Sequence, residues 1–174
     1  ESLGKAVDLD GKTVNAGQTP AKSLGVTDQH SQVQLYTEGP FDKVVTFLAV
    51  DKYRDTVVIT DDKDVDACDF LKNHTMNELI NAERKATEFA LKKAQRMNFT
   101  ITLPEVNEET IGELLMYFMY ETAFAGALLN VDTFNQPGVE EGKKATFAML
   151  GRKGYEAKME EINAAPKKAD YIIG

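Results

Sequence analysis

Runs of β-branched and aliphatic residues between charged turns mark three stretches of the chain as strands. They occupy residues 43–50, 55–60 and 98–103, and Pro104 closes the last one. The first two runs are almost continuously apolar, a pattern typical of strands that are covered on both faces. We therefore predict three strands, with the first two buried on both sides.

Helical periodicity separates these runs. A short helix is predicted over residues 31–37, ending before Gly39-Pro40 because proline cannot continue a helix. Thr75 and Glu78 have the spacing of a capping box, so a second helix begins there. One face of that helix is apolar and is predicted to pack on the core. This stripe comprises Leu79, Ala82, Ala86, Phe89, Ala90, Ala94 and Met97.

A third helix follows Asn107, whose side chain suits the capping position. It is apolar almost all round from residue 111 to 129, so we predict that it is buried between elements or subunits. Glu113 and Glu121 interrupt the run, which disfavours a membrane span. Two more helices are predicted, over residues 139–150 and 155–163.

Strands that are separated by helices predict an α/β fold, with a parallel sheet and flanking helices. Residues 1 to about 28 are rich in Gly, Asp, Thr and Pro, which is the composition of turns. Three strands are few for a doubly wound sheet. We therefore expect that further strands belong to the same sheet and precede this segment.

Composition and charge narrow the function classes. The chain has 174 residues, of which 43% are hydrophobic and 28% charged, as in soluble globular proteins. Its net charge of -8 argues against nucleic-acid or anionic-membrane partners, which require clustered positive charge. Cys68 is the only cysteine, so no intrachain disulfide can form and a reducing compartment, the cytoplasm, is favoured.

Few residues offer acid–base chemistry near neutral pH. His74 precedes a helix cap, where a local structural role is favoured, whereas His30 lies in a polar loop that runs into a helix. A loop imidazole is either a solvated side chain or a proton shuttle. The acidic run at residues 61–66 lacks the glycine and closing glutamate of a calcium loop, so we predict a solvated turn and no metal site.

The segment from Gly126 to Lys143 carries the most specific motif. It begins with a small residue, which is followed by one variable position and two aliphatic residues. Four variable residues then lead to Phe-Asn-Gln-Pro-Gly-Val-Glu-Glu-Gly-Lys. Every fixed position resembles the C-terminal signature of glucose-6-phosphate isomerases. Residues 27–39 are similar to the family segment that bears the active-site histidine, in its bacterial form. Residues 1–5 resemble the family's Glu-Ser-x-Gly-Lys.

The resemblance implies a role for four residues. Glu1 would be the base that moves a proton between C1 and C2 of the sugar phosphate, and His30 would assist ring opening. Lys143 would lie near the ring or C1 oxygens, and Gln136 would contact the substrate or its phosphate. The resemblance implies no metal and no organic cofactor. It also implies a homodimer with a shared active site, acting in glycolysis and gluconeogenesis.

Each of these residues also has an ordinary structural interpretation. Glu1 is then a terminal carboxylate, Lys143 an exposed helix lysine, and Gln136 a hydrogen-bonding partner of its own loop. Three motifs in the family's order favour the catalytic interpretation. Two other functions stay open: a different phosphosugar isomerase of the sugar-isomerase (SIS) family, and a non-catalytic sugar-phosphate-binding module.

The resemblance covers nearly all 174 residues but only the C-terminal portion of such an enzyme. Family members have two SIS α/β domains of flavodoxin-like type and a helical C-terminal segment. We assign residues 1–105 to the second half of the C-terminal SIS domain and residues 106–174 to the helical segment. The Ser/Thr-rich phosphate loop and the Gly-Gly-Arg signature are not in this sequence. We therefore expect the isolated chain, as a fragment, to show little or no turnover.

Overall fold

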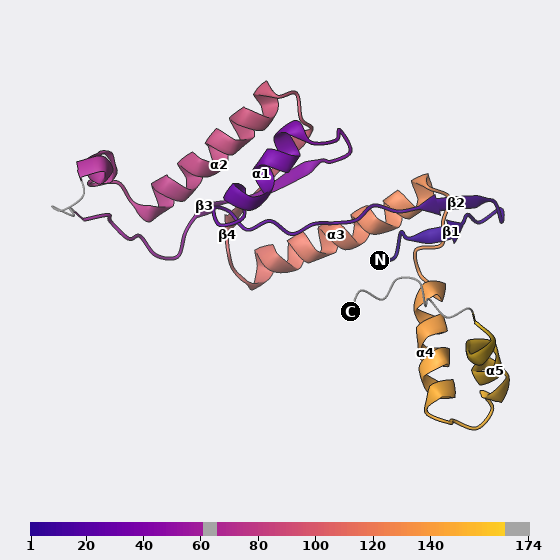
Figure 1. Cartoon of the computed structure of the whole chain (residues 1–174). Coiled ribbons are helices and arrows are strands. Elements are labelled where there is room, and N and C mark those ends of the chain that lie inside the picture. Colours follow the sequence, from indigo (N-terminus) through magenta and orange to yellow (C-terminus); the bar gives the residue numbers. More distant parts are fainter. Residues whose placement is uncertain (61–65, 166–174) are drawn as a thin grey trace. The chain divides into compact units, whose positions relative to one another are not determined.

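A computed structural model of the chain describes residues 1–60 and 66–165 (Figure 1). The chain divides into two compact units. One comprises Glu1–Gln18 together with Met119–Gly174, and the other comprises Thr19–Phe118. The boundary predicted between residues 105 and 106 separates the SIS domain from the helical segment, not these two compact units, and it stays a prediction.

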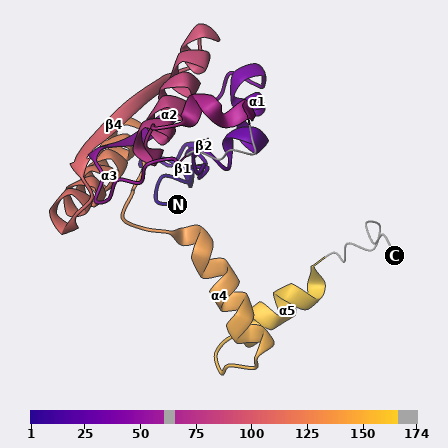
Figure 2. The same cartoon turned by 90° about the vertical axis from the view of Figure 1, so that its left-hand side faces the viewer.

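The unit formed by Thr19–Phe118 contains a parallel pair of strands. β3 (Val45–Lys52) pairs with β4 (Asn98–Glu105) in register from Val45 opposite Asn98 to Lys52 opposite Glu105. The helix α2 (Met76–Lys93) connects them and contacts both β4 and α1 (Gln29–Glu38), as Figure 2 shows. A short 3-10 helix, η1 (Asp66–Leu71), precedes α2. This arrangement confirms the predicted α/β fold with a parallel sheet and flanking helices.

The helices lie where the sequence predicts them. α1 ends at Glu38, before Gly39-Pro40, and Arg96 Nε donates to the carbonyl of Thr37 at 2.7 Å. α3 (Glu108–Leu128) begins after Asn107, whose Oδ1 accepts from the Thr110 amide at 2.9 Å. α4 (Pro137–Met149) and α5 (Glu156–Ala164) match the last two predicted helices within two residues at each end.

The strand predicted over residues 55–60 is wrong. Among the described residues, its only ladder contact is an isolated bridge between Val58 and Thr75. The backbone instead bonds to the segment just before α2, with Ile59 N donating to His74 O and Met76 N donating to Val57 O, each at 2.8 Å. A β-branched run favours extended backbone but does not select a partner, and here the partner is a loop.

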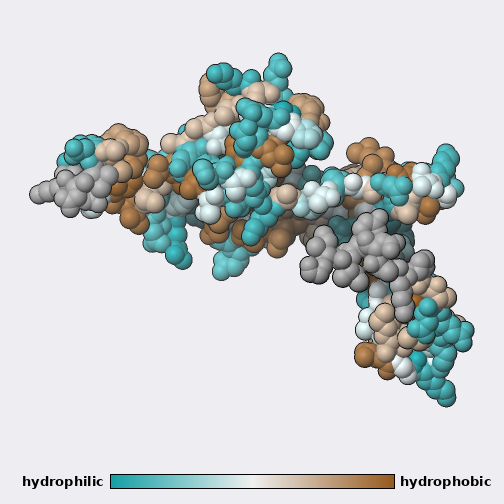
Figure 3. Space-filling model, viewed as in Figure 1, coloured by the Kyte–Doolittle hydropathy of each residue, from teal (hydrophilic) through white to brown (hydrophobic). Residues whose placement is uncertain are grey.

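Within the described residues, the burial predicted for the 43–50 strand and for the α2 stripe is wrong, and other elements of the chain leave α3 largely uncovered, whereas its burial between subunits stays a prediction. In β3 only Ala49 is buried, and the α2 stripe is mostly exposed, with Phe89 at 67%. Leu91, outside that stripe, is fully buried instead. α3 is equally open, and Leu128 is 88% exposed; Figure 3 shows hydrophobic side chains gathered at the surface along α3. Periodicity shows which face is apolar, but not which element covers it.

The surface hydrophobicity of α3 does not make it a membrane span. Among the described residues, none of the helices has the length and apolar character needed to cross a bilayer. The predicted solvated turn over residues 61–66 falls outside the described residues except for Asp66, which begins η1.

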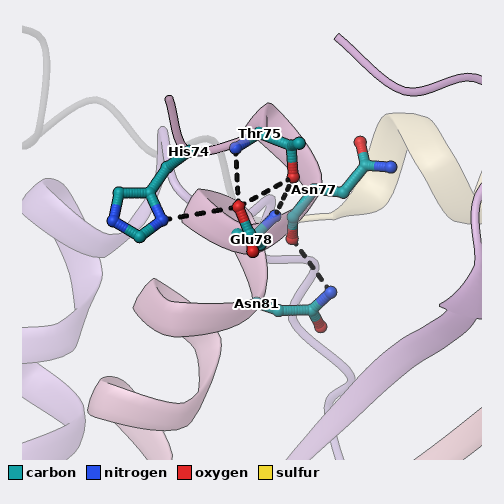
Figure 4. Close-up of polar contacts among 5 residues, drawn as sticks. All are labelled: His74, Thr75, Asn77, Glu78 and Asn81. Atoms are coloured by element: carbon teal, nitrogen blue, oxygen red, sulfur yellow. Dashed lines mark hydrogen bonds and ion pairs between the residues drawn. The ribbon is translucent and has the colours of Figure 1, made fainter. Parts of the chain in front are cut away.

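The start of α2 is a complete capping box, as predicted (Figure 4). Thr75 Oγ1 accepts from the Glu78 amide at 3.1 Å, and Glu78 Oε2 accepts from the Thr75 amide at 2.7 Å. The same oxygen lies 3.4 Å from His74 Nδ1. The Thr75 backbone N–H, assisted by the Thr75 hydroxyl and His74, holds the pKa of Glu78 below its usual value of 4.5. His74 therefore has the local role that its position predicts.

Replacing Thr75 with alanine is expected to loosen the first turn of α2. The variant loses the acceptor for the Glu78 amide, which costs about 1 kcal/mol of helix stability. Amides of that turn should then exchange with deuterium about fivefold faster, as NMR would measure. Thr75→Ser keeps the hydroxyl and should exchange at the original rate. Equal rates in the alanine variant would show that the cap does not stabilise the helix.

The other unit begins with a hairpin. β1 (Lys5–Val7) and β2 (Thr13–Ala16) pair antiparallel within the segment that the sequence indicates only as turns. Leu9 N donates to Asn130 O at 2.8 Å, and Asn130 Nδ2 donates to Asp10 Oδ2 at 3.0 Å. These bonds join the hairpin turn to the link between α3 and α4.

A basic residue joins α5 to α4. Lys158 forms ion pairs with Glu141 on α4 and with Glu161 on its own helix. The Arg152 guanidinium also lies over the Phe147 ring, 4.3 Å from its centroid, in the turn between the helices. The face of α4 that carries Glu141 is therefore directed toward α5.

Candidate functional site

The link from α3 to α4 is well anchored. Val131 and Thr133 are buried, and Val131 N donates to Gly126 O at 2.9 Å. Asp132 Oδ1 accepts from the Phe134 amide at 2.9 Å, which closes a local turn. These contacts fix the direction in which the chain enters α4.

Gln136 is the N-cap residue of α4, and Pro137 follows at the first helical positions, where its missing N–H costs nothing. Within the described residues, the Gln136 side chain makes no capping hydrogen bond to the helix. The side chain is exposed. Its amide is therefore not needed to begin the helix, and it can both donate and accept a hydrogen bond with a ligand.

Lys143 follows Gln136 by seven residues and lies within α4, whereas Gln136 is the N-cap and has the non-helical torsion angles φ -142° and ψ 66°. Lys143 Nζ lies 2.7 Å from Glu140 Oε1, and both side chains are about half exposed. The hydrogen bond from Lys143 holds the pKa of Glu140 below its usual value. The start of α4 thus presents a carboxylate and an ammonium, with the exposed Gln136 amide at its N-cap.

Glu1 is exposed and lies in the turn that leads into β1. Its carbonyl accepts from Gly4 N at 3.0 Å, and the buried Lys5 donates from Nζ to Ser2 O at 2.5 Å. A Cβ atom on Gly17 would lie 2.9 Å from the Gly4 Cα, so the residues that flank β1 and β2 approach closely there. The Gly and Lys of the Glu-Ser-x-Gly-Lys motif therefore shape the turn that carries Glu1.

His30 is exposed in the first turn of α1. The loop before it is held by side chains: Ser23 Oγ lies 2.7 Å from Gln32 Oε1 and 2.8 Å from the Tyr36 hydroxyl. Asp28 Oδ2 accepts from Leu24 N at 2.7 Å and does not cap the helix within the described residues. These contacts connect the loop to α1 on either side of His30.

Three of the four predicted site residues belong to one unit: Gln136 as the N-cap of α4, Lys143 within α4, and Glu1 in the segment before β1. His30 belongs to the unit Thr19–Phe118. The joint action of all four residues on one ligand stays a prediction. Within the part of the chain that the structure describes, no group of three or more His, Cys, Asp or Glu side chains is arranged to hold a metal ion.

Sequence reasoning did not assign a role to Glu140, although the residue is a fixed position of the C-terminal motif. The structure places it in contact with Lys143. The three-residue spacing of Glu140 and Lys143 allows this contact, but many ordinary helix pairs have the same spacing.

Comparison with known proteins identifies relatives along the whole chain. Glucose-6-phosphate isomerase from Carboxydothermus hydrogenoformans is 56% identical over 174 residues, which cover 99% of this chain and 38% of the relative. The enzyme of the same name from Rubrobacter xylanophilus is 46% identical over 158 residues, covering 90% of this chain and 35% of the relative. The chain therefore spans little more than a third of the length of these curated relatives.

A solved structure has the same fold. The crystal structure of a hypothetical protein from Thermus thermophilus superposes with a TM-score of 0.79 at 40% identity, over 87% of this chain and 36% of that one. Residues 1–167 match the family described as phosphoglucose isomerase. This match covers nearly the whole chain, including all four predicted site residues. The chain belongs to the phosphoglucose isomerase family.

Proposed function

We propose that this chain supplies the C-terminal part of an enzyme that interconverts glucose 6-phosphate and fructose 6-phosphate. The observation that carries the proposal is the intact C-terminal motif, in which Gln136 is the N-cap of α4 and Lys143 lies within that helix. Family membership supports it, because the relatives that match along the chain are named for this activity.

The reaction needs two kinds of proton transfer. Opening the cyclic sugar requires an acid and a base close to the ring oxygen and the anomeric hydroxyl, and His30 and Lys143 are suited to that step. Moving a proton between C1 and C2 requires a carboxylate, which is the role of Glu1. Gln136 binds the substrate or its phosphate through its amide. Glu1 takes the proton from one carbon and returns a proton to the other, and the acid and base of ring opening likewise exchange one proton each, so substrate and product have the same composition.

We also propose that the enzyme is a cytoplasmic homodimer whose active site is shared between subunits. The exposed apolar surface of α3 supports an association with further protein, because monomeric soluble proteins rarely expose large contiguous apolar patches. Leu115, Met119 and Phe124 are each at least 60% exposed on that helix.

The proposal is tested with a chimera of the Carboxydothermus hydrogenoformans enzyme, in which the segment aligned with this chain is replaced by it. The chimera is expected to isomerise fructose 6-phosphate in a coupled spectrophotometric assay, and other phosphosugars more slowly. The 174-residue chain by itself is expected to show little or no turnover. Failure of a folded, dimeric chimera to isomerise any hexose phosphate would contradict the proposed function.

A further inference from the structure

Glu140 lies between the two proposed ligand-binding residues of α4. Glu140 and Lys143 are three positions apart within α4, which is the spacing of neighbours on one helical face, and Gln136 precedes them as the N-cap. The Lys143 ammonium contacts the Glu140 carboxylate, with 2.7 Å between Nζ and Oε1. The carboxylate thus restricts where the ammonium lies at the start of α4.

The neighbouring acid does not share this contact. Glu141 forms its ion pair with Lys158 on α5, and Lys158 is largely buried, with 16% of its side chain exposed. The Lys158 ammonium holds the pKa of Glu141 below its usual value, as Lys143 does for Glu140. Two consecutive glutamates therefore serve different functions, one joining α4 to α5 and the other contacting a proposed site residue.

The Glu140 carboxylate is suited to be a temporary partner of the Lys143 ammonium, which a ligand can replace. A lysine side chain has many rotamers, so an unpaired ammonium would sample many positions. A carboxylate three residues earlier on the helix restricts that range. Because the two side chains are about half exposed, their ion pair is weak, and a ligand oxygen can displace the carboxylate.

We propose that Glu140 is a positioning residue that holds the Lys143 ammonium in place until a sugar oxygen replaces the carboxylate. This inference rests on the proposed function, in which Lys143 acts at the ring or C1 oxygen. Glu140 itself transfers no proton in this scheme. Its contribution is to limit the orientations from which the ammonium approaches the sugar.

The test is a double-mutant cycle in the chimera. Glu140→Gln is expected to lower kcat about fivefold with KM within about twofold, because orientation is lost while substrate contacts remain. In the background of Lys143→Gln, the same change should have no further effect on kcat. Glu141→Gln is the matched control: it removes the adjacent carboxylate and is expected to leave kcat unchanged.

The possible outcomes separate this inference from the function on which it rests. If Lys143→Gln lowers kcat and Glu140→Gln does not, only the positioning role is refuted. An equal loss from Glu140→Gln with and without Lys143 would also refute it, because the effect would then not pass through the ammonium. If Lys143→Gln leaves kcat unchanged, the proposed role of Lys143 fails, and the inference about Glu140 fails with it.

Discussion

Replacing Glu1 with glutamine in the chimera is expected to lower kcat by about a hundredfold to ten-thousandfold, the usual contribution of a general base. Glutamine has nearly the same shape but cannot accept the proton that moves between C1 and C2. KM should change by less than about threefold, because the other binding groups are intact. Steady-state kinetics in both directions of the reaction would measure the two parameters.

Two further measurements make this prediction specific. Exchange of the C2 proton of glucose 6-phosphate with solvent deuterium should be lost together with turnover, whereas calorimetric binding of the sugar phosphate should persist. Glu160→Gln, an exposed glutamate on α5, is the control and should behave as the unchanged chimera. Normal isomerisation by the Glu1 variant would refute its role as the base.

The sequence predicts the elements of this chain better than their environment. Local signals determine where a helix begins, and Thr75 with Glu78 and Asn107 with Thr110 form the expected bonds. The strand predicted over residues 55–60 fails because strand pairing depends on a partner that is remote in sequence. Burial is predicted poorly for a related reason. The sequence shows that α3 has an apolar surface, but it does not show which element or subunit covers that surface.

The same distinction between local signals and long-range packing applies to the candidate site. The C-terminal motif is a local property, so the sequence identifies Gln136 and Lys143 as candidates without any knowledge of the fold. The Glu140 contact is also local, yet its spacing is that of many ordinary helix pairs, and only coordinates single it out. The relation of Glu1 and His30 to α4 depends on long-range packing and stays a prediction.

Replacing Gly126 with alanine is expected to destabilise the link that leads to Gln136. A Cβ atom on Gly126 would lie 1.9 Å from Cγ2 of Thr133, far inside van der Waals contact. Thr133 is buried, so the clash forces the link to shift, at a cost of about 1–3 kcal/mol. Alanine also favours a helix by about 1 kcal/mol over glycine, so the net loss in the free energy of unfolding should be up to about 2 kcal/mol. Urea unfolding of the chain would measure it, and kcat/KM of the chimera should fall as well.

Two other substitutions test whether the clash is the cause. Thr133→Ser removes Cγ2, and the remaining Thr133 atoms would lie 3.2 Å or more from the new Cβ, which is tight but tolerable. The double variant Gly126→Ala with Thr133→Ser should therefore recover most of the lost stability. Gly112→Ala lies in the same helix with no atom within 4 Å of its added Cβ, so it should stabilise the chain by about 1 kcal/mol. If Gly126→Ala behaves like Gly112→Ala, the small residue of the C-terminal motif is not required by this contact. If Thr133→Ser restores stability, the motif requires a glycine there because the link to Gln136 packs directly on the α3 backbone.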